Sequence, residues 1–396
     1  MLSQHYIDMT SQKSAIRELF DYGSKRAREI GYENVFDYSL GNPSVPTPQA
    51  FTDALIDLIQ NTDPVALHGY SPSLGIPSVR QAIADSLNRR FDMAFQMEDI
   101  FMAVGAAGAI AHAVRAVTVP GDEVITFAPF FPEYYHYVNE TGAVLKVVPA
   151  DVTSFQINFD AFEEMLTPKT MAVLINTPNN PSGIVYSTAT IDRLAAILTA
   201  KSKEYGHEIY IISDEPYREI VFQGVDAPFI AKHYDNTIVC YSFSKSVSLP
   251  GERIGYVAVN PACKDAARIV DMCGQISRGI GHNCPPSLIQ LAVTKVLDMT
   301  SDISVYEENK TILYKELTRI GFDIVEPGGT FYMFPKALEE NAGAFCERAK
   351  QHDLLLVPSD TFGCPGHFRI CYCIPTEKVL RSIPVFEALA KEYQSF

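Results

Sequence analysis

Basic residues are scarce in this sequence of 396 residues. It has 32 Lys and Arg against 47 Asp and Glu, which leaves a formal net charge of −15. Nucleic acids and anionic lipid surfaces are bound by basic protein surfaces, so the sequence argues against both as partners. Small anionic molecules are not excluded as ligands, because binding them requires only a local cluster of Arg and Lys.

Long apolar runs are also missing. No stretch of about 18 apolar residues occurs, so no transmembrane helix is expected. The N-terminal segment MLSQHYIDMTSQKSAIRELF lacks the apolar core of a signal peptide. We therefore expect a cytoplasmic protein.

The eight cysteines form no CxxC pair and no Cys/His cluster at zinc spacing, so no metal site is predicted. Cys371 and Cys373 flank Tyr372 and share one face of a predicted strand, where buried thiols are the simplest interpretation. Reduced cysteines agree with a cytoplasmic location. A GxGxxG fingerprint for dinucleotides is absent as well.

The length and composition favour two globular domains. One hydrophobic core seldom serves a chain of this length, and 47% hydrophobic with 20% charged residues is typical of a globular protein. In the middle of the chain, short apolar runs alternate with helix-like segments. We interpret them as strands at 99–104, 123–128, 171–176, 209–213, 237–241 and 254–259, and as helices at 106–117 and 191–205.

Apolar runs without alternation are typical of strands that are buried on both faces. Residues 47–284 are therefore predicted to form a large α/β domain with a mostly parallel sheet between helices. Its helix at 191–205 has Thr190 as a candidate N-cap and Gly206 as its expected end.

The pattern changes from about residue 285. Residues 285–396, together with residues 1–46, are predicted to form a smaller α+β domain. Its expected helices are at 287–299, 305–320, 343–351 and the C-terminus, and its expected strands at 322–325, 330–334, 354–357 and 368–372.

Polar or glycine-rich segments follow four of the predicted strands of the large domain. They are residues 105–108, 179–183, 214–217 and 242–245. Ligands of open α/β sheets bind beyond the carboxyl ends of the strands. We therefore expect the four segments to converge on one ligand site at one edge of the sheet.

Two of these segments carry chemically distinctive residues. Lys245 follows a buried strand, and a lysine whose pKa is lowered by burial or by a nearby cation forms a Schiff base with an aldehyde. Arg253 is a candidate for that cation and for a phosphate clamp. Asp214 ends an apolar strand, where a carboxylate needs a positive partner such as a pyridinium nitrogen. Taken singly, a solvated lysine and a helix-capping aspartate are the simpler interpretations.

The loop at Gly105 opens a helix, and the free amides of a helix N-terminus bind phosphate. Small residues also serve tight turns, so this loop alone does not decide between the two interpretations.

Taken together, the segments resemble the class I/II aminotransferases of the fold-type I superfamily, which use pyridoxal 5'-phosphate (PLP), and the aspartate aminotransferases in particular. The resemblance runs from SLGNP at 39–43 to FRICYC at 368–373. It is carried by short motifs in family order and spacing: YSPSLGIPSVR at 70–80, NTPNNPSG at 176–183, DEPY at 214–217, SFSKSVSLPGERIGY at 242–256 and FRI at 368–370.

The resemblance implies a role for individual residues around the cofactor. Lys245 is the expected Schiff-base lysine and proton shuttle, and Asp214 the partner of the ring nitrogen. Tyr217 and Asn180 are the expected donors to the phenolic oxygen, and Phe131 the aromatic ring stacked on the cofactor.

The resemblance also implies a phosphate site and a substrate site. The phosphate site is formed by Gly105, Ala106, Ala107, Ser242, Ser244 and Arg253, with Tyr70 reaching in from the second subunit of a homodimer. Arg369 is expected to grip the substrate α-carboxylate, aided by the backbone at Gly41 and by Asn180. Several have simpler interpretations: Phe131 as core, Tyr70 in a surface turn and Asn180 as a turn former.

By this resemblance the protein moves an amino group between an L-amino acid and a 2-oxo acid by a ping-pong mechanism. Two alternatives stay open. A C–S β-lyase would use the same cofactor residues, and a non-catalytic PLP-binding regulator would lack turnover.

The sequence departs from the family at the distal end of the substrate. Where some members have Thr, Ser or Lys, this chain has Ala107, which neither donates a hydroxyl nor binds a distal carboxylate. Arg278 lies in the segment where other aspartate aminotransferases carry an arginine for that carboxylate, and a solvated helix-end arginine is the alternative. The preferred amino acid is thus left undecided between aspartate, aromatic residues, alanine and others.

Overall fold

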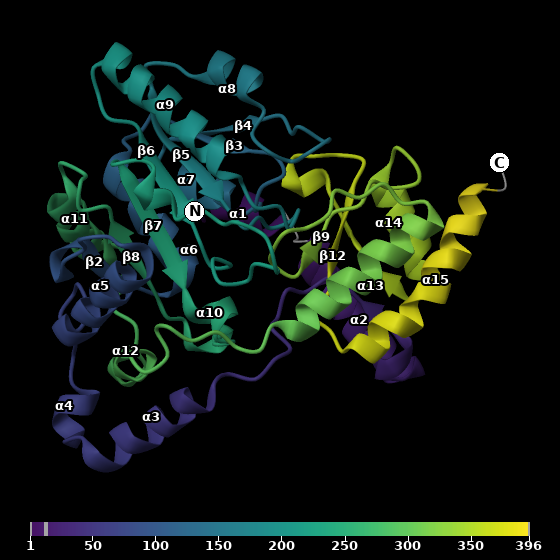
Figure 1. Ribbon diagram of the computed structural model, residues 1–396, viewed down its shortest axis with the longest axis horizontal. Coiled ribbons are helices and arrows are strands. Elements are labelled where there is room, and N and C mark those ends of the chain that lie inside the picture. Colours follow the sequence, from purple (N-terminus) through teal and green to yellow (C-terminus); the bar gives the residue numbers. More distant parts are fainter. Residues whose placement is uncertain (1, 12–14, 395–396) are drawn as a thin grey trace. The chain divides into compact units, whose positions relative to one another are not determined.

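The computed structural model describes residues 2–11 and 15–394, which form two compact units (Figure 1). The larger unit comprises Val45–Ile303 and Gly328–Thr330. The smaller unit comprises Met1–Ser44, Ser304–Pro327 and Phe331–Phe396. Both terminal parts of the described chain thus belong to the smaller unit, and the middle of the chain forms the larger one.

A seven-stranded sheet forms the centre of the larger unit, with the strand order β2-β8-β7-β6-β5-β3-β4. In that order the strands are Ile100–Ala103, Gly255–Val259, Thr237–Ser242, Tyr210–Asp214, Thr170–Asn176, Glu123–Phe127 and Val144–Val148. β8 is antiparallel to both of its neighbours, and the other pairs are parallel. The predicted mostly parallel sheet is confirmed. The sequence prediction missed β4, a half-exposed edge strand with Lys146 at its centre.

Helices cover both faces of this sheet, as Figure 1 shows. In β7, Ile238 and Cys240 pack into the core below α6, α7 and α11, whereas Val239 and Tyr241 face the opposite core. The first face is covered by α6 (Gly105–Val117), α7 (Tyr134–Asn139) and α11 (Ala266–Gly279). The second is covered by α3 (Gln49–Asn61), α5 (Pro77–Phe91), α8 (Phe159–Met165), α9 (Thr188–Tyr205) and α12 (Ser287–Val293).

The predicted N-cap of α9 is wrong by three residues. Ser187 caps the helix, because its Oγ accepts a hydrogen bond of 3.1 Å from the backbone N–H of Thr190. Gly206 ends the helix as predicted, in a left-handed conformation that favours glycine.

Residues 285–303 belong to the larger unit in the structure, whereas the sequence prediction assigned them to the small domain. The reason is packing: Ala292, Val293 and Val296 are buried in the core formed with α3, α5 and the β2 side of the sheet. The helix predicted at 287–299 ends at Val293. The same unit also contains the short helices α4 (Pro64–His68) and α10 (Phe243–Ser246).

The smaller unit combines two short sheets with helices. Phe36–Asp37 (β1) pairs in parallel with Leu354–Leu355 (β10), and β12 (Phe368–Cys371) lies between β11 (Val357–Pro358) and β9 (Tyr332–Met333), antiparallel to both. The helices are α1 (Gln4–Ser11), α2 (Ala15–Ile30), α13 (Ser304–Ile320), α14 (Ala342–Gln351) and α15 (Thr376–Gln394).

The strand predicted at 322–325 does not form. Phe322 is buried there in a cluster of aromatic rings, with its ring edge-on to Phe345, Phe368 and Phe386. The apolar pattern of this segment therefore reflects core packing of one side chain rather than strand pairing.

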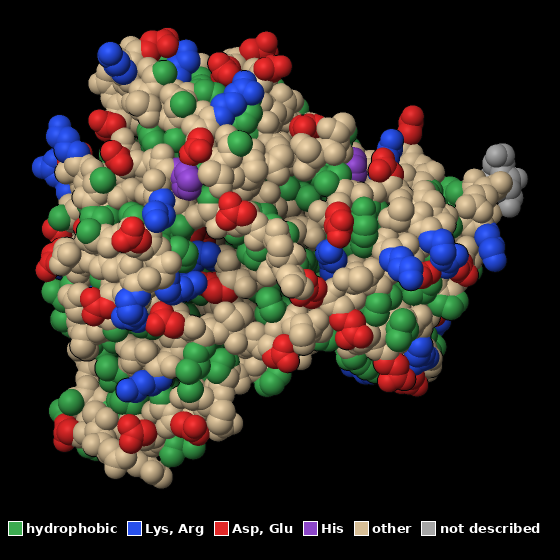
Figure 2. Space-filling view, viewed as in Figure 1, with side chains coloured by type: hydrophobic (Ala, Val, Ile, Leu, Met, Phe, Trp, Pro, Cys, Tyr) green, Lys and Arg blue, Asp and Glu red, His purple; other side chains and the backbone are tan. Residues whose placement is uncertain are grey.

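Acidic and basic side chains are interspersed over the face of the molecule that Figure 2 shows. Within residues 2–11 and 15–394, no helix combines the length and the apolar composition that a bilayer crossing requires.

Candidate active site

The sheet topology brings the four polar segments to one edge of the larger unit. β2, β5, β6 and β7 run in the same direction, so their carboxyl ends meet at that edge, where β8 begins. At this edge, Asp214 at the end of β6 lies opposite Asn176 of β5 and Cys240 of β7 in the register of the sheet.

Asp214 is the most distinctive group at this edge. Its side chain is buried, and its Oδ2 accepts a hydrogen bond of 2.6 Å from the Tyr134 hydroxyl. Its Oδ1 is buried without a hydrogen-bond partner. Burial raises the pKa of this carboxyl to about 7, although the Tyr134 hydrogen bond opposes the shift and nearby Glu215 adds to it. A positively charged donor would form a hydrogen bond with the remaining oxygen and favour the ionised form of Asp214.

Asn176 ties this strand end to the next loop. Its Nδ2 donates to the Asp214 carbonyl oxygen at 2.8 Å, and its Oδ1 accepts from the Asn180 N–H at 2.7 Å. The side chains of Asn180 and Tyr217 are both buried. Sequence reasoning did not single out Asn176, although a polar residue that ends an apolar strand was the same signal that identified Asp214.

Phe131 and Tyr134 lie on the face of the sheet toward which Asp214 points. The Phe131 ring is partly buried, and it meets the Tyr134 ring edge-on with 5.8 Å between centroids. Tyr134 was missed from sequence because its partner Asp214 lies 80 residues away along the chain.

Lys245 lies in α10, directly after β7, and is partly buried. Ser242, the last residue of β7, and Ser244 are both buried beside it. Because β7 neighbours β6, the lysine and Asp214 follow adjacent strands at the same sheet edge.

Gly105 and Arg253 form a cradle at the N-terminus of α6. Gly105 has φ +75°, and a Cβ atom there would lie 2.8 Å from Arg253 Nη2. Arg253 is exposed, has φ +49°, and donates from Nη1 to the Pro250 carbonyl at 2.9 Å. Ala106 and Ala107 form the first turn of the helix and are partly exposed. The glycine therefore lets the guanidinium lie close to the free amides of the helix N-terminus, and both groups favour an anion.

Arg369 and Gly41 lie together in the smaller unit. Arg369 is buried in β12, donates from Nη2 to the Ser39 carbonyl at 2.6 Å, and lies over the Tyr332 ring at 4.7 Å. A Cβ at Gly41 would overlap the Tyr332 hydroxyl. The tyrosine thus joins the two residues that sequence analysis assigned to the substrate carboxylate.

Tyr70 and Arg278 line one cavity of about 680 Å³ in the larger unit. Tyr70 is fully exposed within the described chain. The structure thereby brings together two residues that sequence analysis had considered separately.

The family model for aminotransferase class I and II matches residues 33–383. An aspartate aminotransferase of Thermotoga maritima is 29% identical over 363 residues, which cover 90% of this chain and 91% of that protein. Aromatic-amino-acid aminotransferase 2 of Thermococcus litoralis is 28% identical over 396 residues, with 96% of each chain covered. A crystal structure of an amino transferase from Eubacterium rectale is 49% identical, has a TM-score of 0.97 and covers 99% of each chain.

These findings confirm the family, the fold and the aminotransferase activity that the sequence motifs predicted. The Asp214 carboxyl with one unpartnered oxygen and the cradle at Gly105 agree with this assignment. The chain belongs to the aminotransferase class I and II family, whose members use PLP.

Proposed function

We propose that PLP binds at the strand ends of the larger unit, with its ring nitrogen at Asp214 and its phosphate at Gly105. Two observations support this fit. Asp214 Oδ1 is a buried acceptor without a donor, which is what a protonated ring nitrogen would supply. The space beside Gly105 would be filled by any Cβ and is bordered by the Arg253 guanidinium.

When bound, PLP supplies a positively charged ring that draws electrons from the substrate α-carbon. Asp214 would keep the ring nitrogen protonated, and Tyr134 holds the Asp214 carboxyl in place. Tyr217 and Asn180 would donate to the phenolic oxygen, and Phe131 would cover one face of the ring.

Lys245 would hold the cofactor through its side-chain amine. The same amine would serve as the general base that accepts the proton from the substrate α-carbon, a task for a group at the reacting atoms. The short helix that carries Lys245 follows β7 without a linker, so the backbone of this residue is anchored to the sheet.

The α6 N-terminus would hold the phosphate, with the amides of Ala106 and Ala107, the hydroxyls of Ser242 and Ser244, and Arg253 as its partners. Tyr70 completes this site in a second copy of the chain, which makes the functional protein a homodimer. The full exposure of Tyr70 and the apolar residues Ile56, Ile59 and Val65 exposed on α3 and α4 support such an interface.

Arg369 binds the substrate α-carboxylate through its planar fork of N–H donors, a geometry that lysine does not offer. The Gly41 backbone completes this end within the smaller unit. Support comes from the buried position of Arg369, fixed by the Ser39 carbonyl and the Tyr332 ring.

The substrates are an L-amino acid and a 2-oxo acid. The relatives named above include an aspartate and an aromatic-amino-acid aminotransferase. Ala107 argues against binding of a second, distal substrate carboxylate by the α6 loop. Arg278, which lines the same cavity as Tyr70, supports binding of that carboxylate by the second subunit. The cytoplasmic location stays a prediction.

The observation that carries this proposal is the unpartnered buried oxygen of Asp214. It is tested by mixing the PLP-loaded enzyme with each amino acid in turn, without an oxo acid, and following the visible spectrum. Stoichiometric conversion to the pyridoxamine form identifies the amino donors. Release of pyruvate and ammonia from cystathionine, without that conversion, would instead support the C–S lyase, and no reaction with any amino acid would contradict both.

A further inference from the structure

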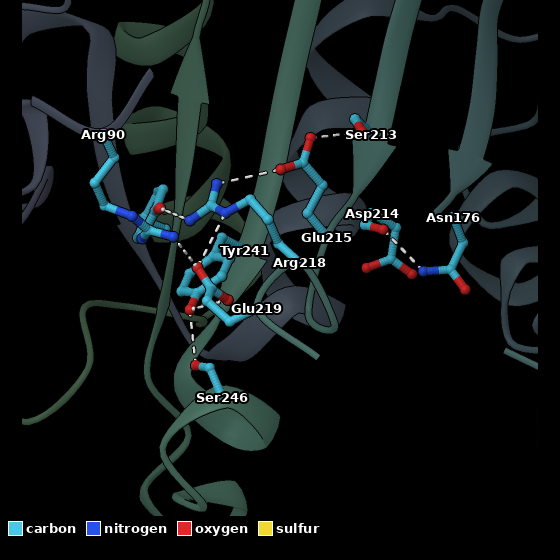
Figure 3. A network of polar contacts seen from close by, with 10 residues as sticks. Arg90, Asn176, Ser213, Asp214, Glu215, Arg218, Glu219, Tyr241 and Ser246 are labelled. Carbon is cyan, nitrogen blue, oxygen red and sulfur yellow. Dashed lines mark hydrogen bonds and ion pairs between the residues drawn. The ribbon is translucent and has the colours of Figure 1, made fainter. Parts of the chain in front are cut away.

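A buried network of charged and hydroxyl groups centres on Arg218, the residue after Tyr217 (Figure 3). The Arg218 side chain is only 9% exposed. Its Nη1 donates to Glu215 at 3.2 Å, its Nε to Glu219 at 3.2 Å, and its Nη2 to the Tyr256 hydroxyl at 2.9 Å. One guanidinium thus binds three acceptors.

Glu219 extends the network toward the lysine. Besides Arg218 it accepts from Arg90 Nη2 at 2.8 Å and from the Tyr241 hydroxyl at 2.9 Å. Burial would raise the Glu219 pKa, but Arg218 and Arg90 outweigh it and hold the pKa below its usual value. Glu219 therefore accepts only, so the Tyr241 proton goes to Glu219 and the Ser246 hydroxyl donates to Tyr241 at 2.7 Å.

These partners lie in, or shortly after, three adjacent strands. Glu215 directly follows Asp214 at the end of β6. Tyr241 belongs to β7, and Ser246 directly follows Lys245. Tyr256 belongs to β8, three residues after Arg253. The network joins the ends of β6, β7 and β8, and each of these ends carries one residue assigned to the cofactor.

The network acts from behind the sheet. Side chains alternate along a strand, so Asp214 faces α7, whereas Ser213 faces the other way and donates to Glu215 at 2.8 Å. The Arg218 guanidinium also lies over the Tyr241 ring at 4.2 Å on that opposite face. Its contacts are therefore with the supports of the site rather than with the reacting atoms.

Stability alone does not account for such a network. The attraction within a buried ion pair only partly offsets the free energy of solvation that its charges lose. Well-packed apolar side chains often replace such a pair without loss of stability. What a hydrogen-bonded cation adds is a fixed register between the segments that it joins.

We propose that Arg218 is a positioning residue for the reaction: it sets the register of the three strand ends that carry Asp214, Lys245 and Arg253. This inference rests on the proposed function of those residues. Because the network lies in the larger unit, we expect it to affect the reacting amine and not the binding of the substrate carboxylate by Arg369 in the smaller unit.

The test compares the PLP-loaded Arg218→Met and Arg218→Lys variants with the unchanged enzyme. For Arg218→Met we expect kcat to fall about 100-fold with KM for the amino acid nearly unchanged, because a displacement of about 1 Å at the reacting groups has that effect. We also expect the pH midpoint of the visible absorbance of the lysine-bound cofactor to shift. Arg218→Lys keeps the charge but not the three-way fork, so kcat should stay well below that of the unchanged enzyme.

Arg80→Met is the matched control, because Arg80 is also buried in the larger unit and donates to the backbone carbonyls of Ile100 and Met97. It should lower thermal stability while leaving kcat and the absorbance midpoint unchanged. If Arg218→Met does not fold, Tyr241→Phe removes the hydroxyl between Glu219 and Ser246 and should move kcat and the midpoint in the same direction, by about tenfold in kcat.

A folded Arg218→Met enzyme with unchanged kcat and midpoint would overturn the inference, as would equal losses in Arg80→Met. Lys245→Ala, measured in parallel, distinguishes a failure of the proposed function from a failure of the positioning role alone. If Lys245→Ala kept the visible absorbance, the proposed function would fail. If it lost the absorbance while Arg218→Met behaved as the unchanged enzyme, only the positioning role would fail.

Discussion

The two units of this aminotransferase present groups of opposite charge in buried positions. The larger unit holds a carboxyl, Asp214, with one oxygen that lacks a donor. The smaller unit holds a guanidinium, Arg369, fixed by a carbonyl oxygen and an aromatic ring. A buried carboxylate recruits a cationic ring, and a buried guanidinium recruits a carboxylate.

The difference divides the chemistry between the units. In the proposed function, residues of the larger unit hold the cofactor and move the proton, so their loss should affect kcat and the absorbance of the resting enzyme. The proposal assigns the part of the substrate that does not react to the smaller unit, so loss of those residues should affect kcat/KM and leave that absorbance unchanged.

Lys245→Ala should show the largest effect. Without the amine, the cofactor is not held covalently and the general base is missing, so turnover should fall by about 10⁴-fold or more. The visible absorbance of the resting enzyme should disappear. Turnover like that of the unchanged enzyme in this variant would refute the assignment of Lys245.

Asp214→Asn should lower kcat by roughly 10³-fold, because a neutral amide does not keep the ring nitrogen protonated. KM should change far less than kcat. Single-turnover kinetics on the PLP-loaded variant measure this. A change confined to KM would indicate that Asp214 binds the substrate rather than the cofactor.

The stability of the cofactor-free protein should fall as the pH rises from about 4 to 7. The pKa of Asp214 rises from 3.8 to about 7 on folding, mainly through burial. In that window the folded state keeps a proton that the unfolded state releases, so each step up in pH favours unfolding, by about 4 kcal/mol in all. Urea unfolding at several pH values should show a flatter dependence in Asp214→Asn, and equal slopes would contradict the shift. The pKa of Glu215 is also raised by burial, but this residue is the same in both proteins.

Arg369→Lys should lower kcat/KM roughly 100-fold, since a point charge replaces a two-pronged contact to a carboxylate. The absorbance of the resting enzyme and its pH midpoint should not change. A changed midpoint would contradict the assignment of Arg369 to substrate binding alone.

Arg278→Met should have the smallest effect, a change of about tenfold in the preference for aspartate over alanine. The ratio of kcat/KM for the two amino donors measures it. An unchanged ratio would leave Arg278 as a solvated residue at the end of α11, which was the alternative interpretation from sequence.

The candidate site residues that sequence reasoning identified share one signal: a polar or glycine-rich segment at the end of an apolar run. Asp214 ends a fully buried strand, and Gly105 and Lys245 lie shortly after two others, so this pattern does not depend on distant contacts. The same reasoning applied to β5 would have identified Asn176, which ends that strand and bonds to Asp214.

What sequence reasoning missed depends on contacts between distant segments. Tyr134 bonds to Asp214 from 80 residues away, and Arg218 bonds to Tyr256 from 38 residues away. No local pattern distinguishes these side chains from solvated ones. The failed strand at 322–325 shows the converse, because the buried ring of Phe322 gave a local pattern without a partner strand.

The most direct test is an electron-density map of the resting enzyme with PLP bound. It should show continuous density from Lys245 Nζ to the cofactor, and the ring nitrogen within hydrogen-bond distance of Asp214 Oδ1. A ring nitrogen directed at any other group, or a cofactor bound away from the Gly105 loop, would contradict the account.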